Sequence, residues 1–147
     1  MPLTQIGEVT NATLPETSPD GTLVGGHAIG VQCSVSGSSD GYSVTLAAND
    51  NANGTTTITG QATSQGSTSL SGTFVTTVTG TLYDGTDCSL TFKFENNPLP
   101  SGAAGIAPGL IWGHVSCPMA VAEGQAQGSG AATCDVESDL LFENCSQ

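Results

Sequence analysis

Few residues of this chain have types and spacings that could carry chemistry. The segment Gly37–Gly41 matches the pattern Gly-x-Ser-x-Gly, in which one large class of hydrolases presents a nucleophilic serine on a strand-to-helix turn. The residues that follow it are patterned as a strand, so no helix would supply the oxyanion hole. All five residues are also common turn formers. We therefore interpret the segment as a turn.

A metal centre built on histidine and cysteine is the second candidate. His114 and Cys117 have a ligand-like spacing, and Cys134 or Cys145 would complete a tetrahedral zinc site. On a strand, however, positions 114 and 117 face opposite sides of the sheet. The other histidine, His27, has no evident partner for acid–base catalysis. We expect no catalytic residue and no resident cofactor, and therefore a protein that is not an enzyme.

Carboxylates offer better candidates for holding an ion. The segment Asn49–Gly54, which includes Asp50, places oxygen ligands before a glycine but lacks the first aspartate and last glutamate of a calcium loop. A hairpin turn is the preferred interpretation. Asp135, Glu137 and Asp139 alternate along the polar side of the last expected strand, about 7 Å apart. They either face water, which we favour, or hold a divalent ion such as calcium at a subunit contact.

Five cysteines are candidates for disulfide bonds, namely Cys33, Cys88, Cys117, Cys134 and Cys145. The first four fall on expected inward faces, and spacing alone selects no pairing. Cys117 and Cys134 flank one loop and are the first choice. The fifth cysteine is then free or bridges another chain. Because disulfides persist in oxidising compartments, we expect an extracellular or cell-surface protein.

Threonine-rich stretches raise two further binding hypotheses. Ice binding needs regular Thr-x-Thr ranks on successive strands, which only Thr55–Thr57 and Thr77–Thr81 approach. Sugar binding usually shows exposed aromatic rings, for which Trp112, Tyr42 and Tyr83 are available. A module that binds calcium or carbohydrate is therefore the alternative functional hypothesis.

The elements that must position these residues are strands, because apolar and polar residues alternate with period two along most of the chain. The 55–65 strand buries little and is placed at an edge. The 70–82 strand is expected to bend at Gly72 or Gly80, and Asp84–Gly85 to form a turn. The expected strands span 26–35, 42–48, 55–65, 70–82, 88–94, 111–119 and 134–142.

This pattern predicts an all-β fold, a two-sheet antiparallel β-sandwich of about seven or eight strands, with a β-barrel as the alternative. Residues 26–147 form the single domain, and residues 1–25 an extended amino-terminal arm. The arm can pair with its own sheet or add a strand to a neighbour's. Its candidate assembly residues are Leu3, Gln5, Ile6 and Val9.

Composition excludes several classes of function. The 147 residues suit one domain and carry a formal charge of −12, with Lys93 as the only basic residue besides histidine. Nucleic-acid binding needs several lysines or arginines facing phosphate, so it is excluded, and an anionic membrane surface is disfavoured for the same reason. No stretch approaches a transmembrane helix, and the first residues do not have the pattern of a signal peptide.

Three segments, Gly25–Cys33, Leu110–Cys117 and Phe142–Cys145, resemble the small secreted cysteine-containing lipoproteins of myxobacteria. The resemblance spans about residues 25 to 145 and implies a surface location and a disulfide-bearing β fold, but no site residues. The chain departs from that group because it has no lipobox or amino-terminal cysteine. The leading hypothesis is a non-enzymatic surface protein whose partners are itself or other surface proteins.

Overall fold

The structure is a computed structural model, and every regular element among its described residues is a strand. Seven strands have nine or more residues: β4 His27–Ser38, β5 Gly41–Asp50, β6 Gly54–Ala62, β7 Ser67–Thr76, β8 Leu82–Thr91, β12 Leu110–Ala122 and β13 Thr133–Glu143. Six are short: β1 Leu3–Gln5, β2 Thr17–Pro19, β3 Leu23–Val24, β9 Lys93–Phe94, β10 Asn97–Pro98 and β11 Ile106–Ala107. The described residues are 3–5, 17–19, 23–24, 27–50, 54–76, 81–94, 97–98, 105–123 and 133–147.

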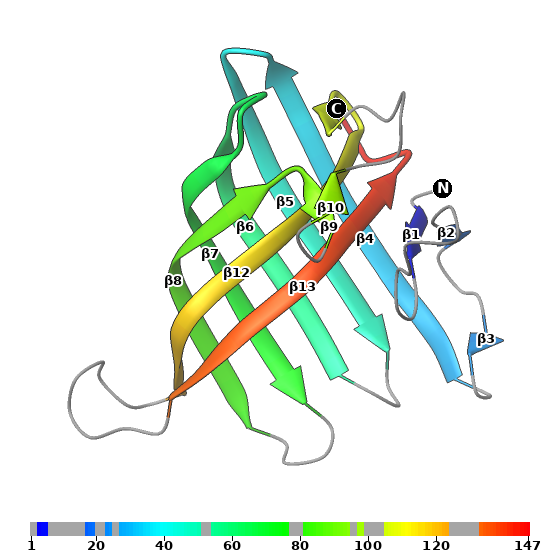
Figure 1. The fold of residues 1–147 in the computed structure, drawn as a ribbon. Helices are drawn as coiled ribbons and strands as arrows, with labels where there is room; N and C mark the ends of the chain where they lie inside the picture. The colour runs from blue at the N-terminus through cyan, green and yellow to red at the C-terminus, as the bar shows by residue number, and fades with distance from the viewer. Residues whose placement is uncertain are drawn as a thin grey trace.

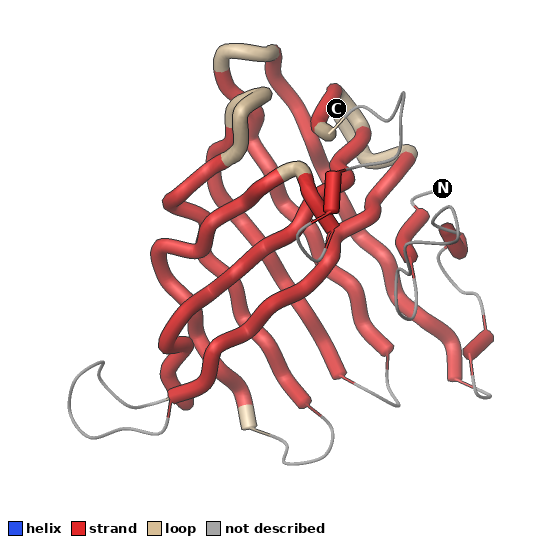
Figure 2. The backbone as a smooth tube through the Cα atoms, viewed as in Figure 1, coloured by secondary structure: helices blue, strands red, loops and turns tan. Residues whose placement is uncertain are grey.

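One continuous antiparallel sheet contains all seven long strands, in the order β13-β12-β8-β7-β6-β5-β4. The sheet curls round so that β12 and β13 pass in front of β4, β5 and β6 (Figure 1; strands red in Figure 2). The all-β prediction is confirmed. The curled sheet corresponds to the barrel alternative. The prediction of a two-sheet sandwich is confirmed only in part, because the front and back strands share one core but belong to one continuous sheet.

The core lies inside this curled sheet and follows the predicted alternation. Successive inward residues of β4 and β5 are buried while their neighbours are more exposed. Burial of such branched side chains from water is the main stabilising contribution, about 25 cal/mol per Å² of apolar area. The largest fully buried side chains inside the sheet are Val31, Val35, Val44, Leu46, Ile58, Leu70, Leu90, Ile111 and Val115.

The carboxyl-terminal tail brings the two ends of the sheet together. Ser146 forms a parallel bridge with Ser34 of β4, and its carbonyl oxygen accepts a hydrogen bond from the Val35 amide at 2.9 Å. Gly109 joins the same contact, since its amide donates to the Val35 oxygen at 2.8 Å and its oxygen accepts from the Cys145 amide at 2.9 Å. We call this contact the seam.

Two sequence-based expectations about strands are wrong. The threonine-rich strand expected at 55–65 is β6, which lies between β5 and β7 and not at an edge. Its Ile58 is fully buried, so one apolar residue is enough to anchor it. Residues 70–82 are not one bent strand. Val75 pairs with Leu82, so the chain reverses between β7 and β8.

Two further details differ from the expected pattern. Asp84–Gly85 lies inside β8 and not in a turn. Met119, expected to face inward, is 54% exposed, because the β12–β13 register shifts between Cys117 and Ala120 and Met119 has a positive φ of 54°. A β-bulge of this kind turns one side chain away from its expected face.

The amino-terminal arm contributes backbone pairs at both ends of the sheet. β1 pairs with β13, with Leu3 opposite Glu143 and Thr4 opposite Phe142, and β2 pairs with β1. β3 pairs with β4 at the other end. Of the candidate assembly residues, Leu3 and Gln5 belong to β1, whereas Ile6 and Val9 lie outside the described residues.

Candidate functional site

Two disulfide bonds join distant parts of the chain. Cys33 bonds to Cys145 across a sequence separation of 112, and Cys88 bonds to Cys117 across a separation of 29. The expected Cys117–Cys134 bond is wrong. The register places Val136, not Cys134, opposite Cys117, while the inward face of β12 meets Cys88 of the neighbouring β8.

Cys134 is the free cysteine among the described residues and is only half-buried. Burial, and next the charge of the adjacent Asp135, raise the pKa of its thiol. A raised pKa keeps the thiol protonated and weakly nucleophilic at neutral pH. The position therefore does not have the electropositive surroundings of a reactive cysteine.

The carboxylates proposed as weak metal ligands do not converge within the described part of the chain. Asp135 accepts a hydrogen bond from the Met119 amide at 2.9 Å, so its carboxylate holds the bulge of β12. Glu137 is exposed. The side chains of Asp139 and Asp50 lie outside the described residues. No group of three or more potential ligands occurs among the side chains that the structure describes.

The remaining candidates from the sequence lie as strand geometry requires. Cys117 faces the core in its disulfide, while His114, on the opposite face of β12, is half-buried between the paired Thr91 and Asp139 positions. Gly37–Gly41 is the tight end of the β4–β5 hairpin, in which Ser38 pairs with Gly41. The interpretation of this segment as a turn is confirmed.

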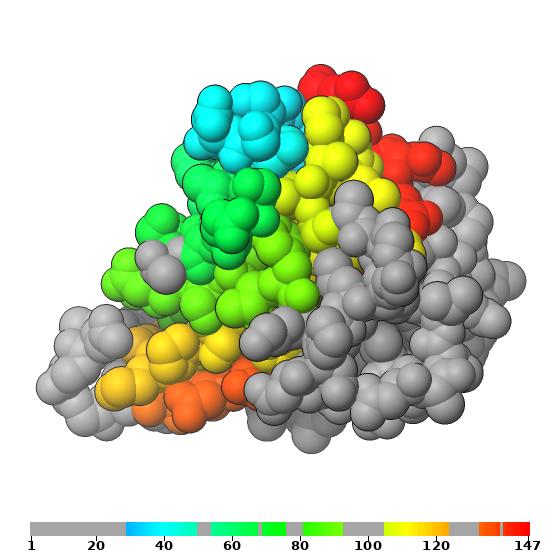
Figure 3. Space-filling model, turned by 45° about the horizontal axis from the view of Figure 1, so that its top comes forward, coloured from blue at the N-terminus to red at the C-terminus, as the bar shows by residue number. Residues whose placement is uncertain are grey.

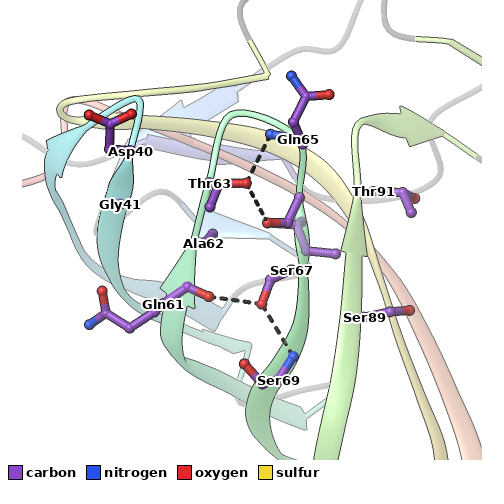
Figure 4. A pocket seen from close by; sticks show the side chains of 12 residues that line it. Asp40, Gly41, Gln61, Ala62, Thr63, Gln65, Ser67, Ser69, Ser89 and Thr91 are labelled. Carbon is purple, nitrogen blue, oxygen red and sulfur yellow. Dashed lines mark hydrogen bonds between the residues drawn. The ribbon is translucent and has the colours of Figure 1, made fainter.

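A site that sequence inspection did not single out lies at the end of β6, β7 and β8. It is an open concavity of about 670 Å³. The β4–β5 turn forms one wall, since the Ser64 amide donates to the Ser39 oxygen at 3.4 Å and joins the two hairpin ends (Figure 3, cyan and green). Figure 4 shows its polar lining: Asp40, Gln61, Thr63, Gln65, Ser67, Ser69, Ser89 and Thr91.

A second concavity of about 350 Å³ lies further along the same three strands. Its lining is again short and polar: Thr57, Thr59, Ser71, Thr73, Asp84 and Thr86, with Gly72 and Gly85 between them. These side chains alternate with the buried Ile58, Leu70 and Cys88, which places them on the outer face of the sheet. We call the two concavities together the outer groove.

Hydrogen bonds hold the polar hairpin at one end of the groove. Thr63 Oγ1 donates to the Gly66 oxygen at 3.3 Å and accepts from the Gln65 amide at 3.1 Å. Ser67 Oγ donates to the Gln61 oxygen at 2.8 Å and accepts from the Ser69 amide at 3.3 Å (Figure 4). These bonds use the hydroxyls of Thr63 and Ser67 to hold the backbone of the hairpin. The side chains of Gln61 and Gln65 are exposed to solvent.

Comparison with known proteins gives no functional assignment, because no known protein family, no curated protein and no solved structure matches this chain. Across the residues that the structure describes, no helix has the length and apolar character needed to span a membrane. The features of the molecule that bear on function are the disulfides, the arm and the outer groove.

Proposed function

We propose that this protein is a non-enzymatic structural or interaction protein of an extracellular or cell surface that assembles by exchanging its amino-terminal arm between copies. One observation carries the proposal. Two strands of the arm pair with the long strands at the two ends of the sheet: β1 pairs with β13, and β3 pairs with β4. An arm that pairs with its own sheet can form the same pairs with an identical sheet, which is the basis of domain swapping.

Among the described residues, Ser146 and Gly109 cover the β4 edge at Ser34 and Val35, whereas only β1 pairs with the outer edge of β13. Natural sheets often protect an edge with lysine, because a desolvated charge opposes pairing with another chain. The only lysine here is Lys93, which lies in β9 and in neither β4 nor β13. Release of the arm would therefore leave β13 ready to accept a strand.

The surface location is supported by the two disulfides. Both close loops of the chain, and such bonds persist in oxidising compartments. A formal charge of −12 on 147 residues also keeps separate copies soluble before they assemble.

A cross-linking experiment tests arm exchange. In a Cys134→Ser background, Leu3→Cys with Glu143→Cys places two thiols at paired positions of β1 and β13. We expect oxidation to give covalent dimers and higher multimers on non-reducing gels, because the partner of residue 3 comes from another copy. The matched control is Thr45→Cys with Thr59→Cys, paired between β5 and β6, which should cross-link only within one chain.

Deletion of residues 1–22, which removes β1 and β2, provides the second test. The full chain should form assemblies in size-exclusion chromatography and electron microscopy, whereas the shortened chain should remain monomeric with both disulfides intact. If both forms run as monomers, and residues 3 and 143 cross-link only within a chain, arm exchange is wrong.

A further inference from the structure

We propose that the outer groove of β6, β7 and β8 is a binding site for a neutral carbohydrate chain. The groove is separate from the edges used by the arm, because β12 lies between β8 and β13 and β5 lies between β6 and β4. This binding activity therefore does not depend on assembly.

The shape of the groove fits an extended chain. Thr59 and Gln61 are successive outward positions of β6, and Ser71 and Ser69 are successive outward positions of β7. The two concavities therefore follow one another along the same strands. From Thr57 to Thr63 the strand direction covers about 20 Å at roughly 3.3 Å per residue, enough for several sugar rings in a row.

The chemistry of the lining matches the hydroxyl groups of sugars. Serine and threonine hydroxyls and glutamine amides both donate and accept hydrogen bonds, as sugar hydroxyls do. Within the described part of the chain, no hydrogen bond engages the side chains of Gln61, Ser89 or Thr91. These groups can bond to a ligand without breaking an existing contact.

Other ligand classes fit less well. An anionic ligand would meet Asp40 and Asp84, with no lysine or arginine in the lining to offset them. A divalent ion would need converging carboxylates, but these two lie in different concavities. A peptide strand would need an open backbone edge, whereas β6, β7 and β8 are each paired on both sides.

Ice requires a flat and regular array of hydroxyls, which this face does not provide. The β7–β8 register shifts between Ser67 and Leu70 and again between Leu70 and Gly72. These irregularities break the repeat, and Gln61 and Asp84 interrupt the threonine ranks. A concave, mixed hydroxyl and amide surface favours a flexible polyhydroxylated chain.

The lining contains no aromatic residue, so ring stacking does not contribute to affinity. Binding must come from many hydrogen bonds, each worth about 1 kcal/mol net. Single sugars should therefore bind weakly, and affinity should rise with chain length as more of the groove is filled.

The test begins with an array of neutral, sulfated and uronic-acid oligosaccharides probed with the full chain. We expect binding to neutral chains of four or more sugars, with or without calcium. The neutral hexasaccharide that binds most strongly is then titrated by calorimetry. Gln61→Ala should weaken binding of this hexasaccharide roughly tenfold, because one or two hydrogen bonds are lost. The matched control Gln32→Ala removes an exposed glutamine from β4 and should leave affinity unchanged.

Ser71→Trp provides a second variant, because Ser71 lies where the two concavities meet and its side chain is exposed. The large ring should block a long chain and lower hexasaccharide affinity at least tenfold, with an unchanged melting temperature. Binding only to acidic glycans, binding that needs calcium, equal effects of Gln61→Ala and Gln32→Ala, or no neutral ligand on the array would each overturn the proposal.

Discussion

At the scale of single residues, Cys134 has a property that can be measured directly. Its thiol pKa is raised first by burial and then by the charge of Asp135. We expect alkylation by iodoacetamide at pH 8 to be several times slower than for a cysteine in an unstructured peptide, with its midpoint at a higher pH. Mass spectrometry of the native protein over a pH series measures this.

Asp135→Asn is the matched variant for that measurement, because it removes the charge and keeps the side-chain volume. Asp135→Asn should move the alkylation midpoint part of the way toward that of the unstructured peptide. If the unsubstituted protein already had the same midpoint as the peptide, the raised pKa of Cys134 would be contradicted. The sign for stability follows from linkage. The Cys134 thiol has a higher pKa in the folded protein than in the unfolded chain. Its contribution to stability is therefore fully present below the pKa of the unfolded thiol and is lost as pH rises through the pKa of the folded protein.

The residues of the disulfides were partly predictable and their pairing was not. Alternation places Cys33, Cys88 and Cys117 on inward faces, which the structure confirms. The choice of partner depends on which strands become neighbours, and β8 and β12 are adjacent although a long segment separates them in the sequence. No local pattern carries that information, so the nearby Cys134 was the wrong choice for Cys117.

At the scale of elements, the bulge in β12 depends on one side chain. The Asp135 carboxylate accepts a hydrogen bond from the Met119 amide. The register shift between β12 and β13 leaves this amide without a backbone acceptor opposite it. Asp135→Ala should lower the free energy of unfolding by about 1 kcal/mol, since it removes one hydrogen bond at an exposed site. Asp135→Asn keeps an acceptor oxygen and should cost less. Denaturant titration distinguishes them, and equal losses would contradict this role.

The β7–β8 hairpin shows why element boundaries were harder to predict than strand type. Apolar residues alternate with threonine from Leu70 to Leu82, and this pattern alone favours one long strand. The turn dipeptide of this segment, Asp84–Gly85, lies within β8, where Gly85 is needed for close packing. A Cβ at Gly85 would lie 2.9 Å from the Cys117 Cβ, so glycine here makes room for a disulfide.

At the scale of the whole molecule, the all-β class followed from the sequence, whereas closure of the sheet did not. Alternation specifies which side of each strand faces inward but not whether the strands form one curled sheet or two flat ones. Closure depends on the seam, where Gly109 and Ser146 reach β4 from distant parts of the chain. The outer groove does not depend on the seam, because its lining comes from the β4–β5 turn and from the neighbouring strands β6, β7 and β8.

The two disulfides should stabilise different regions of the molecule, and removing each separately tests this. Loop-closure entropy gives about 5 kcal/mol for Cys33–Cys145 and about 3.5 kcal/mol for Cys88–Cys117. Cys33→Ala with Cys145→Ala should lower stability and speed amide exchange at the seam residues Val35 and Ser146, while amides of β7, β8 and β12 stay protected.

Cys88→Ala with Cys117→Ala should have the opposite exchange pattern. Both cysteines are fully buried between β8 and β12, so their loss also leaves a cavity in the core. Faster exchange should appear in β8 and β12, with the seam protected. Hydrogen exchange followed by mass spectrometry separates the two patterns at residue scale. If both variants opened the same amides, the sheet would unfold as one unit, and the seam would not be a separately stabilised closure.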